Sequence, residues 1–256
     1  MEFYISASTD IGTRRKVNQD SLSVRRLETR TGKMVLAVLC DGMGGLNFGE
    51  LASGAIVSAF TDWMYRELSA LSRHPLEDHT IRKQWSELIE AENSRIRAYG
   101  ERYHCMTGST VTALLMTESR YYLLNIGDSR AYEIGEQVTQ LTEDHTVVAN
   151  EVRLGNLTKE QADHSSIQNV LTRCVGVKET AYPDLFFGTV RKGAVYMLCS
   201  DGFRHRINET EMQEHLLYAV KGKPSEMKRR EEHLIELTKQ RGETDNISVI
   251  TIYAEG

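Results

Sequence analysis

Acidic residues stand at the ends of several apolar, strand-like segments of this sequence. The run from Val35 to Cys40 contains β-branched and aliphatic residues without alternation, which is typical of a strand buried on both faces, and it ends at Asp41. Four further carboxylates adjoin similar segments: Asp20, Asp128, Asp201 and Asp245. If these segments meet at one sheet edge, their carboxylates repel one another unless cations bind. All-oxygen ligation selects hard divalent ions, so the pattern predicts a site for several Mg²⁺ or Mn²⁺ ions.

Each of these aspartates also has a simpler explanation when it is taken alone. Asp and Gly favour turns, and Asp41 is followed by Gly42, Gly44 and Gly45. A turn therefore explains any single pair, whereas the recurrence of the pattern favours a shared metal site. No Cys and His combination has the spacing of a zinc site.

The elements that would position these residues are short strands and paired helices. Strand-like runs lie at residues 2–8, 21–28, 34–40, 109–117, 120–126, 130–134, 185–190, 194–199 and 246–253. Helical spacing predicts helices over 49–72 and 80–103 and a pair over about 209–241, with Pro224 beginning the second. Several strands are joined by short connections, which indicates antiparallel hairpins. We therefore expect one α+β domain over residues 1–256, with helices packed on antiparallel sheets.

Residues 143–176 form a long insertion between strand-like runs. It contains patches of helical spacing, followed by the segment HSSIQNVLTRCVG. Insertions of this length often carry function, although a disordered loop is the simpler alternative.

The composition argues against several classes of protein. A net charge of −5 disfavours a dedicated nucleic-acid surface. No apolar run approaches the ~18 residues of a membrane span, and the first residues, MEFYISASTD, do not resemble a secretory signal. The four cysteines form no CxxC pair and fit reduced thiols. We expect a cytoplasmic protein that binds neither membranes nor nucleic acids, and nothing requires more than a monomer.

Eight segments of the chain occur in the order and spacing of a known family. They are TDIGTRRKVNQDS, DGMGG with GELAS, GSTVTALL, NIGDSRAY, LTEDHT, NVLTRCVG, SDG and DNISVI. Together they resemble the type 2C protein phosphatases, which are metal-dependent serine/threonine phosphatases (PPM), and the compact bacterial members look most similar. The resemblance extends from about residue 5 to residue 253. One such segment is weak evidence, but eight in order are specific.

This resemblance implies a four-layer αββα sandwich, in which two antiparallel sheets lie between helix pairs and a metal cleft lies at one edge. Residues 143–176 match a mobile flap beside the cleft. Asp41 matches the carboxylate that bridges two metal ions, and the Gly42 carbonyl matches a ligand of one of them. Glycine suits that position because no side chain crowds the backbone oxygen.

The other aspartates match further members of the family's metal site. Asp201 and Asp245 match direct ligands, and Asp20 matches a carboxylate that orders metal-bound waters. Asp128 matches the ligand of a third, weaker metal, which it shares with Asp201. The resemblance thus implies two Mn²⁺ or Mg²⁺ ions in the core site and a weaker third.

Arg15 matches the arginine that clamps the substrate phosphate, a role suited to a planar, permanently charged group. The alternative is a surface arginine beside Arg14, but the count back from Asp20 favours the clamp. Two positions depart from animal or eukaryotic members and are common in bacterial ones. Gln19 replaces a glutamate, and Met43 replaces a histidine proposed as general acid. Because methionine cannot donate a proton, the leaving group's proton must come from a metal-bound water.

The implied reaction is hydrolysis of phosphoserine and phosphothreonine in proteins. A hydroxide formed from a metal-bridging water attacks phosphorus, without a covalent phosphoenzyme. The implied partners are phosphorylated protein substrates, and stand-alone bacterial relatives often oppose a serine/threonine kinase.

Two other functions agree with parts of the sequence. A serine hydrolase could use Ser129, in the segment GDSR, with His205, but this leaves the aspartates unexplained. A catalytically inactive phosphoprotein-binding module is the other alternative. Inactive relatives usually lose a metal aspartate, and none is missing here.

Overall fold

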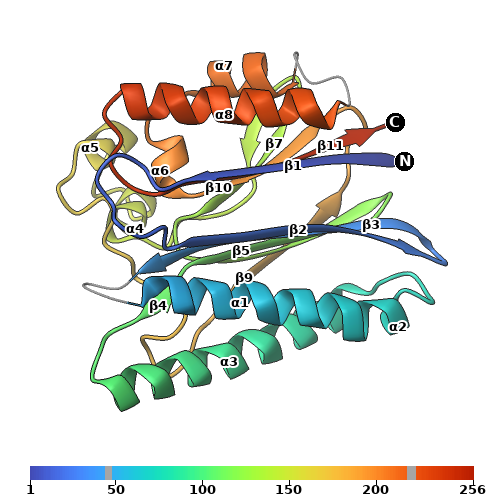
Figure 1. The fold of residues 1–256 in the computed structure, drawn as a ribbon, viewed down its shortest axis with the longest axis horizontal. Coiled ribbons are helices and arrows are strands. Elements are labelled where there is room, and N and C mark those ends of the chain that lie inside the picture. The colour runs from blue at the N-terminus through green and yellow to red at the C-terminus, as the bar shows by residue number, and fades with distance from the viewer. Residues whose placement is uncertain (44–47, 218–222) are drawn as a thin grey trace.

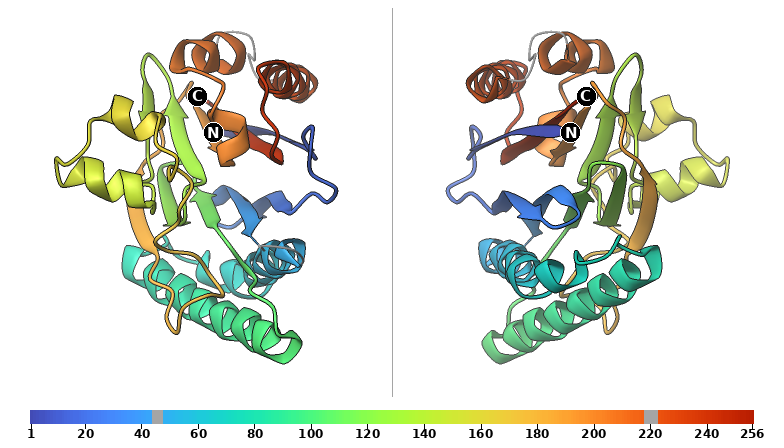
Figure 2. Two further views of the ribbon diagram at one scale, coloured as in Figure 1. Left: turned by 90° about the vertical axis from the view of Figure 1, so that its left-hand side faces the viewer. Right: turned by 90° about the vertical axis from the view of Figure 1, so that its right-hand side faces the viewer.

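The fold is a sandwich of two antiparallel sheets whose outer faces are covered by helices. The computed structural model describes residues 1–43, 48–217 and 223–256, so Gly44 and Gly45 of the glycine-rich segment lie outside the described residues. Within the described ranges, Figures 1 and 2 show layers in the order helices, sheet, sheet, helices. The predicted αββα architecture is therefore confirmed.

One sheet has the strand order β1-β11-β10-β7-β8. Its strands are β1 (Glu2–Asp10), β11 (Ile247–Glu255), β10 (Val195–Cys199), β7 (Arg130–Ile134) and β8 (Val138–Gln140). The other sheet has the order β2-β3-β5-β6-β9, and the short β4 pairs with the end of β3. Its strands are β2 (Asp20–Thr29), β3 (Gly32–Met43), β4 (Gly108–Ser109), β5 (Val111–Met116), β6 (Arg120–Ile126) and β9 (Asp184–Thr189).

The helices lie mainly where their spacing predicted them. They are α1 (Gly49–Trp63), α2 (Ser69–Leu71), α3 (Asp78–Tyr103), α4 (Val147–Arg153), α5 (Lys159–Asp163), α6 (Asp201–Arg204), α7 (Glu209–Met212) and α8 (Pro224–Gln240). The helix predicted over 49–72 widens into a π-helical segment at Met64–Leu68. Another π-helical segment, Gln213–Leu217, follows α7. Pro224 begins α8 as predicted, because its missing N–H has no intrahelical partner there.

Strand β3 is buried on both faces, as its unbroken apolar run predicted. Leu36 and Val38 belong to the hydrophobic cluster between this sheet and helices α1 and α3. Val35 and Ala37 belong to the cluster between the two sheets. A further cluster joins the first sheet to the helices above it. Two-sided burial holds the end of β3, and therefore Asp41, in one position.

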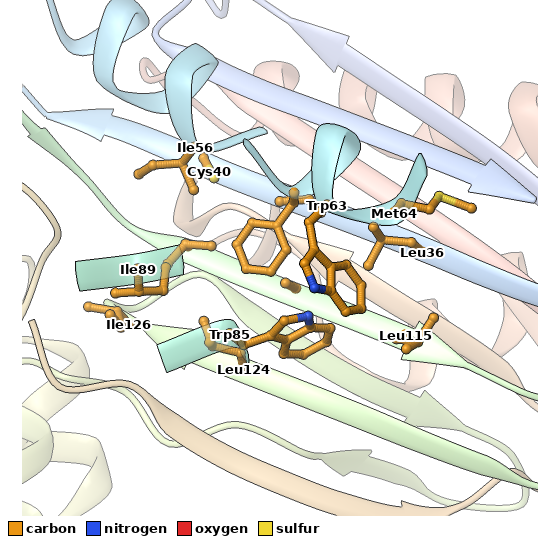
Figure 3. Close-up of a cluster of buried hydrophobic side chains, with 14 of the residues drawn as sticks. Leu36, Cys40, Ile56, Trp63, Met64, Trp85, Ile89, Leu115, Leu124 and Ile126 are labelled. Atoms are coloured by element: carbon orange, nitrogen blue, oxygen red, sulfur yellow. The ribbon is translucent and has the colours of Figure 1, made fainter. Parts of the chain in front are cut away.

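The cluster between the sheet and helices α1 and α3 is rich in aromatic side chains (Figure 3). Phe60 and Trp63 of α1 lie edge-on against Trp85 of α3, with ring centroids 5.5 and 5.6 Å from Trp85. Ile81, Trp85 and Ile89 repeat at four-residue spacing and are fully buried, which is the apolar face that the sequence predicted. Removal of a buried aromatic ring of this kind costs about 3–5 kcal/mol of stability.

Two short elements were not predicted from the sequence. β8 is a strand of three residues and α6 is a helix of four, so neither is long enough to show a hydrophobic period. The insertion at 143–176 contains the short helices α4 and α5. In the described part of the chain, no helix combines the length and apolar character needed to cross a membrane.

Candidate active site

The five predicted aspartates come from both sheets. Asp20 begins β2 and Asp41 lies near the end of β3, and the two are opposite each other in the strand register. Asp201 begins α6 directly after β10, and Asp245 lies just before β11. Asp128 lies in the turn from β6, in one sheet, to β7, in the other. In Figure 1, α6 and the start of β2 lie at the end of the sandwich opposite the chain termini.

The charges of these aspartates act on one another. Burial raises the pKa of Asp41 well above its usual range, and the charges of Asp20, Asp201, Asp128 and Asp245 raise it further. The geometry agrees, because Asp20 and Asp41 are opposite each other in the register and a Cβ on Gly202, next to Asp201, would lie 3.6 Å from Asp245 Cβ. The predicted convergence of the strand ends is therefore present in the fold.

Two other members of the cluster also have strongly raised pKa values. Burial, followed by the charge of Asp201, raises the pKa of Asp128 to about 7, and the nearby Arg204 opposes this shift. Burial also raises the pKa of Asp20 to about 7, and the charges of Asp201 and Asp245 add to it. The nearby Ser248 and Ser200 hydroxyls oppose the shift, although neither forms a hydrogen bond with the carboxylate. A buried, like-charged cluster of this kind is costly unless protons or cations neutralise it.

The chemistry of the cluster fits hard cations. Both carboxylate oxygens of Asp20 and Oδ1 of Asp201 are buried without a hydrogen-bond partner among the described residues. Each such oxygen costs about 1–3 kcal/mol unless something satisfies it. Within residues 1–43, 48–217 and 223–256, however, no three His, Cys, Asp or Glu side chains are arranged as ligands of one ion. The cluster thus supplies the donors and the charge, and the side chains must reorient to coordinate.

One reason for this arrangement is the contact between Asp245 and Arg15. Arg15 donates from Nε to Asp245 Oδ1 at 2.7 Å and from Nη2 to Oδ2 at 2.6 Å. Half of the Arg15 side chain is exposed (51%). The neighbouring Arg14 is exposed and makes no hydrogen bond or ion pair within the described residues. The structure therefore brings Arg15, and not Arg14, to the carboxylates.

The segment that carries Arg15 is fastened against the start of β11. The Asn246 side chain accepts a hydrogen bond from the Gln19 N–H at 2.9 Å and donates one to the Ile11 carbonyl at 2.9 Å. Gly12 has φ +77°, and a Cβ there would lie 1.9 Å from the Asp245 carbonyl oxygen. Asn246 was not predicted to have a role, although its place beside Asp245 in the segment DNISVI is a usable signal.

The backbone around Asp41 is held equally tightly. The Asp41 N–H donates to Thr110 Oγ1 at 2.9 Å, and its carbonyl accepts from the Thr110 N–H at 2.9 Å. A Cβ on Gly42 would lie 2.3 Å from the Gly49 carbonyl oxygen and 2.6 Å from that of Gln19. Glycine is thus required here by close backbone approach. Thr110 is a positioning residue that sequence reasoning missed.

The pair suggested for a serine hydrolase does not form in the structure. Ser129 is fully buried, and its hydroxyl is paired with Thr110 Oγ1 at 2.9 Å. His205 faces Glu243 instead, with Nδ1 3.7 Å from Oε2. Within the described chain no contact joins Ser129 to His205, so this arrangement provides no activated serine nucleophile.

A hollow of about 960 Å³ lies between the insertion and the carboxylate end of the sandwich. Its lining includes His145, Arg173, Asp184 and Arg204. Asp184 accepts a hydrogen bond from Arg173 Nη1 at 2.8 Å and pairs with His145 Nε2 at 2.8 Å. Burial lowers the pKa of His145 although Asp184 opposes the shift. None of the five aspartates lines the hollow, and Arg204, which lies 3.8 Å from Asp128, connects it to the cluster.

Comparison with known proteins identifies the family of the chain. The sequence matches the Protein phosphatase 2C family over residues 12–236. It is 32% identical to the serine/threonine phosphatase stp of Listeria monocytogenes, over 95% of this chain and 93% of the relative. The serine/threonine phosphatase of S. agalactiae superposes with a TM-score of 0.85 at 29% identity, covering 99% of this chain and 100% of that one.

A further solved structure bears on the metal site. The catalytic domain of the serine threonine protein phosphatase PstP, in complex with two manganese ions, superposes with a TM-score of 0.80 at 29% identity and covers 99% of each chain. The fold and the carboxylate cluster define a metal-dependent phosphatase. The chain belongs to the Protein phosphatase 2C family and is a serine/threonine phosphatase.

Proposed function

We propose that this phosphatase hydrolyses phosphoserine and phosphothreonine at the aspartate cluster, with two Mn²⁺ or Mg²⁺ ions in the core of the site. The observation that carries the proposal is the set of buried carboxylate oxygens on Asp20 and Asp201 without hydrogen-bond partners. Oxygen donors in a buried, acidic cluster suit hard divalent cations. The manganese ions of the PstP relative support the same choice.

The residues have distinct roles in this proposal. Asp41 would hold both ions, the Gly42 carbonyl would be a further ligand, and Asp201 and Asp245 would complete the direct protein ligands. Asp20 would order waters around the ions, a role that its enclosed position opposite Asp41 in the register supports. When bound, the ions supply positive charge to the phosphoryl oxygens and lower the pKa of a water that attacks phosphorus.

Arg15 binds the phosphate of the substrate. Its guanidinium is half-exposed and holds Asp245 through a bidentate contact, so it can turn to a phosphate with the same fork geometry once Asp245 binds a cation. Met43 carries no transferable proton, so a water must protonate the leaving serine or threonine oxygen. Ser129 is buried and paired, which supports direct hydrolysis without a covalent phosphoenzyme.

A third, weaker ion binds at Asp128 together with Asp201. Asp128 is buried (4% exposed), and the charge of Asp201 contributes to its raised pKa, which supports the assignment of both carboxylates to one ion. Asp128 would hold this ion on the side of the cluster nearest the hollow, because Arg204 lies beside Asp128 and also lines the hollow.

Residues 143–176 act as a flap within a single catalytic domain, residues 1–256, and help to select the substrate. Both ends of the segment are anchored. Asp144 is held by Arg130 through bonds of 2.7 and 2.8 Å, and the Gly176 N–H donates to Asn93 Oδ1 at 2.7 Å. Between the anchors, exposed Leu154 and other apolar side chains offer a surface for a protein substrate.

The substrates are phosphorylated proteins in the cytoplasm, produced by a bacterial serine/threonine kinase that this phosphatase opposes, and it works as a monomer. The bacterial relatives named serine/threonine phosphatases support this context. Phosphoproteomics of a strain without the phosphatase tests it, because sites of one kinase should gain phosphate together.

Turnover of p-nitrophenyl phosphate and of a phosphothreonine peptide tests the central proposal. We expect activity with Mn²⁺ or Mg²⁺, loss of activity with EDTA, and no inhibition by a serine-directed fluorophosphonate. Full turnover in metal-free buffer would contradict the metal mechanism. Asp62→Asn, an exposed aspartate on α1, is the control for the loss expected from Asp41→Asn.

A further inference from the structure

The last residue of α6 places a positive charge beside Asp128. Arg204 is largely enclosed, with 12% of its side chain exposed. Its Nη2 lies 3.8 Å from Asp128 Oδ2 and 3.4 Å from the Asp128 carbonyl oxygen. The guanidinium is permanently charged and cannot lose a proton to make room for another cation. Arg204 therefore places a permanent positive charge beside Asp128, the carboxylate that we propose as a ligand of the third ion.

The same guanidinium has a second carboxylate within reach. Arg204 Nη2 lies 3.6 Å from Asp144 Oδ2, and Asp144 is itself held by Arg130. The Nε of Arg204 is buried without a hydrogen-bond partner among the described residues. Arg204 thus stands between two carboxylates with no short bond to either. It can move toward Asp144 when a cation approaches Asp128, and it remains ion-paired when it does so.

We propose that Arg204 competes with the divalent cation for Asp128 and thereby keeps the third ion weakly bound. The proposal rests on the assignment of Asp128 as a ligand of that ion. Bound metal and guanidinium are alternative neutralising charges, and the like charge of Arg204 disfavours the ion until the guanidinium has moved. Asp144 sets the cost of that movement, because it receives Arg204.

A merely structural role for Arg204 leads to a different expectation. If Arg204 only neutralises Asp128 and Asp144, its loss disorders the site and weakens every bound ion. Competition instead requires that loss of Arg204 strengthen the third ion. Replacement of Asp144 should have the opposite effect, because Arg204 then has only Asp128 to pair with. Whether each substitution strengthens or weakens binding of the third ion therefore distinguishes competition from a purely structural role.

Calorimetric titration of the metal-free protein with Mn²⁺, checked by counting free Mn²⁺ with electron paramagnetic resonance, tests the proposal. For Arg204→Met we expect the third ion to bind at least tenfold more tightly, with the two tight ions changed by less than about twofold. For Asp144→Asn we expect a weaker third ion. Arg206→Ala, an exposed arginine two residues further on, is the matched control and should bind as the wild type does.

Asp128→Asn locates the site in both backgrounds. It should remove the third ion from the wild type and from Arg204→Met, while two ions remain. An Arg204→Met protein whose third ion is unchanged or weaker would overturn the competition, and so would tighter binding in Asp144→Asn. If Asp128→Asn binds the same ions as the wild type, Asp128 is not a ligand. The competition then fails together with the third site, whereas the two-ion mechanism stands.

Discussion

Neutralising Asp20 should stabilise the metal-free protein while it impairs the enzyme. Burial and the charges of Asp201 and Asp245 raise the Asp20 pKa to about 7, from an ordinary value of 3.8. Between these two pH values the folded state binds more protons than the unfolded state. The free energy of unfolding therefore falls as pH rises through this window. At pH 8 the stability that a protonated Asp20 would provide has been lost.

The size of this stabilisation follows from the shift in the pKa of Asp20. About three pKa units at roughly 1.4 kcal/mol each give an upper value of about 4 kcal/mol at pH 8. Asparagine keeps the size of the side chain and removes its charge, but neighbouring carboxylates share the repulsion. We expect Asp20→Asn to raise the unfolding free energy by about 2–4 kcal/mol in EDTA, because one like charge leaves the buried cluster. For a domain of this size, the Tm would rise by roughly 5–10 °C.

Thermal and urea unfolding in EDTA at pH 8 and pH 5 measure this difference. At pH 5 the increase in unfolding free energy caused by Asp20→Asn should be smaller, because Asp20 is then protonated in the folded wild type. With saturating Mn²⁺ the order should reverse, since ligand binding stabilises the wild type more. Asp62→Asn should change neither series, because this aspartate is exposed. The reasoning is refuted if Asp20→Asn is less stable than the wild type in EDTA at pH 8, or if it gains equally at both pH values.

Three further substitutions test the site. Asp41→Asn should lower kcat by orders of magnitude in a folded protein, and near-normal peptide turnover would remove its bridging role. Arg15→Ala should lower kcat/KM by about one to two orders of magnitude, mainly through KM, because roughly 1.5–3 kcal/mol of charge-assisted bonding is lost. Kinetics of Arg14→Ala provide the control, and damage there with a silent Arg15→Ala would misplace the clamp. Gly42→Ala should lower stability by about 1–3 kcal/mol in thermal unfolding, because its Cβ meets the Gly49 carbonyl at 2.3 Å; an unchanged Tm would refute this reasoning.

The layers of the fold could be predicted from local patterns. β3 showed its two-sided burial through an unbroken apolar run, and α3 showed its buried face through Ile81, Trp85 and Ile89 at regular spacing. Such patterns extend over many residues, so they remain recognisable when one position departs from the pattern. The three-residue β8 and the four-residue α6 have too few residues to show a period.

The site was predictable in its residue types but not in its contacts. Strand-end carboxylates indicated the convergence, because strands of a sandwich can end at a common edge. The bidentate contact between Arg15 and Asp245 joins residues 230 positions apart and has no local signal. The hydrogen bonds of Thr110 and Asn246 to backbone groups likewise join residues that are distant in the sequence, so they too have no local signal. Side-chain pairing across the two sheets depends on the packing of whole layers, which short motifs do not encode.

The distribution of positive charge within the site indicates where metal ions should bind most tightly. Arg15 compensates Asp245 at one side of the cluster, and Arg204 lies beside Asp128 at the other. Among the described residues no cationic side chain forms an ion pair with Asp41, and the charges that act most strongly on its pKa are those of other aspartates. The centre of the cluster is therefore the least compensated part, and a cation gains most there. If Arg204 competes for Asp128 as proposed, the charges of the fold favour cations near Asp41 over a cation near Asp128.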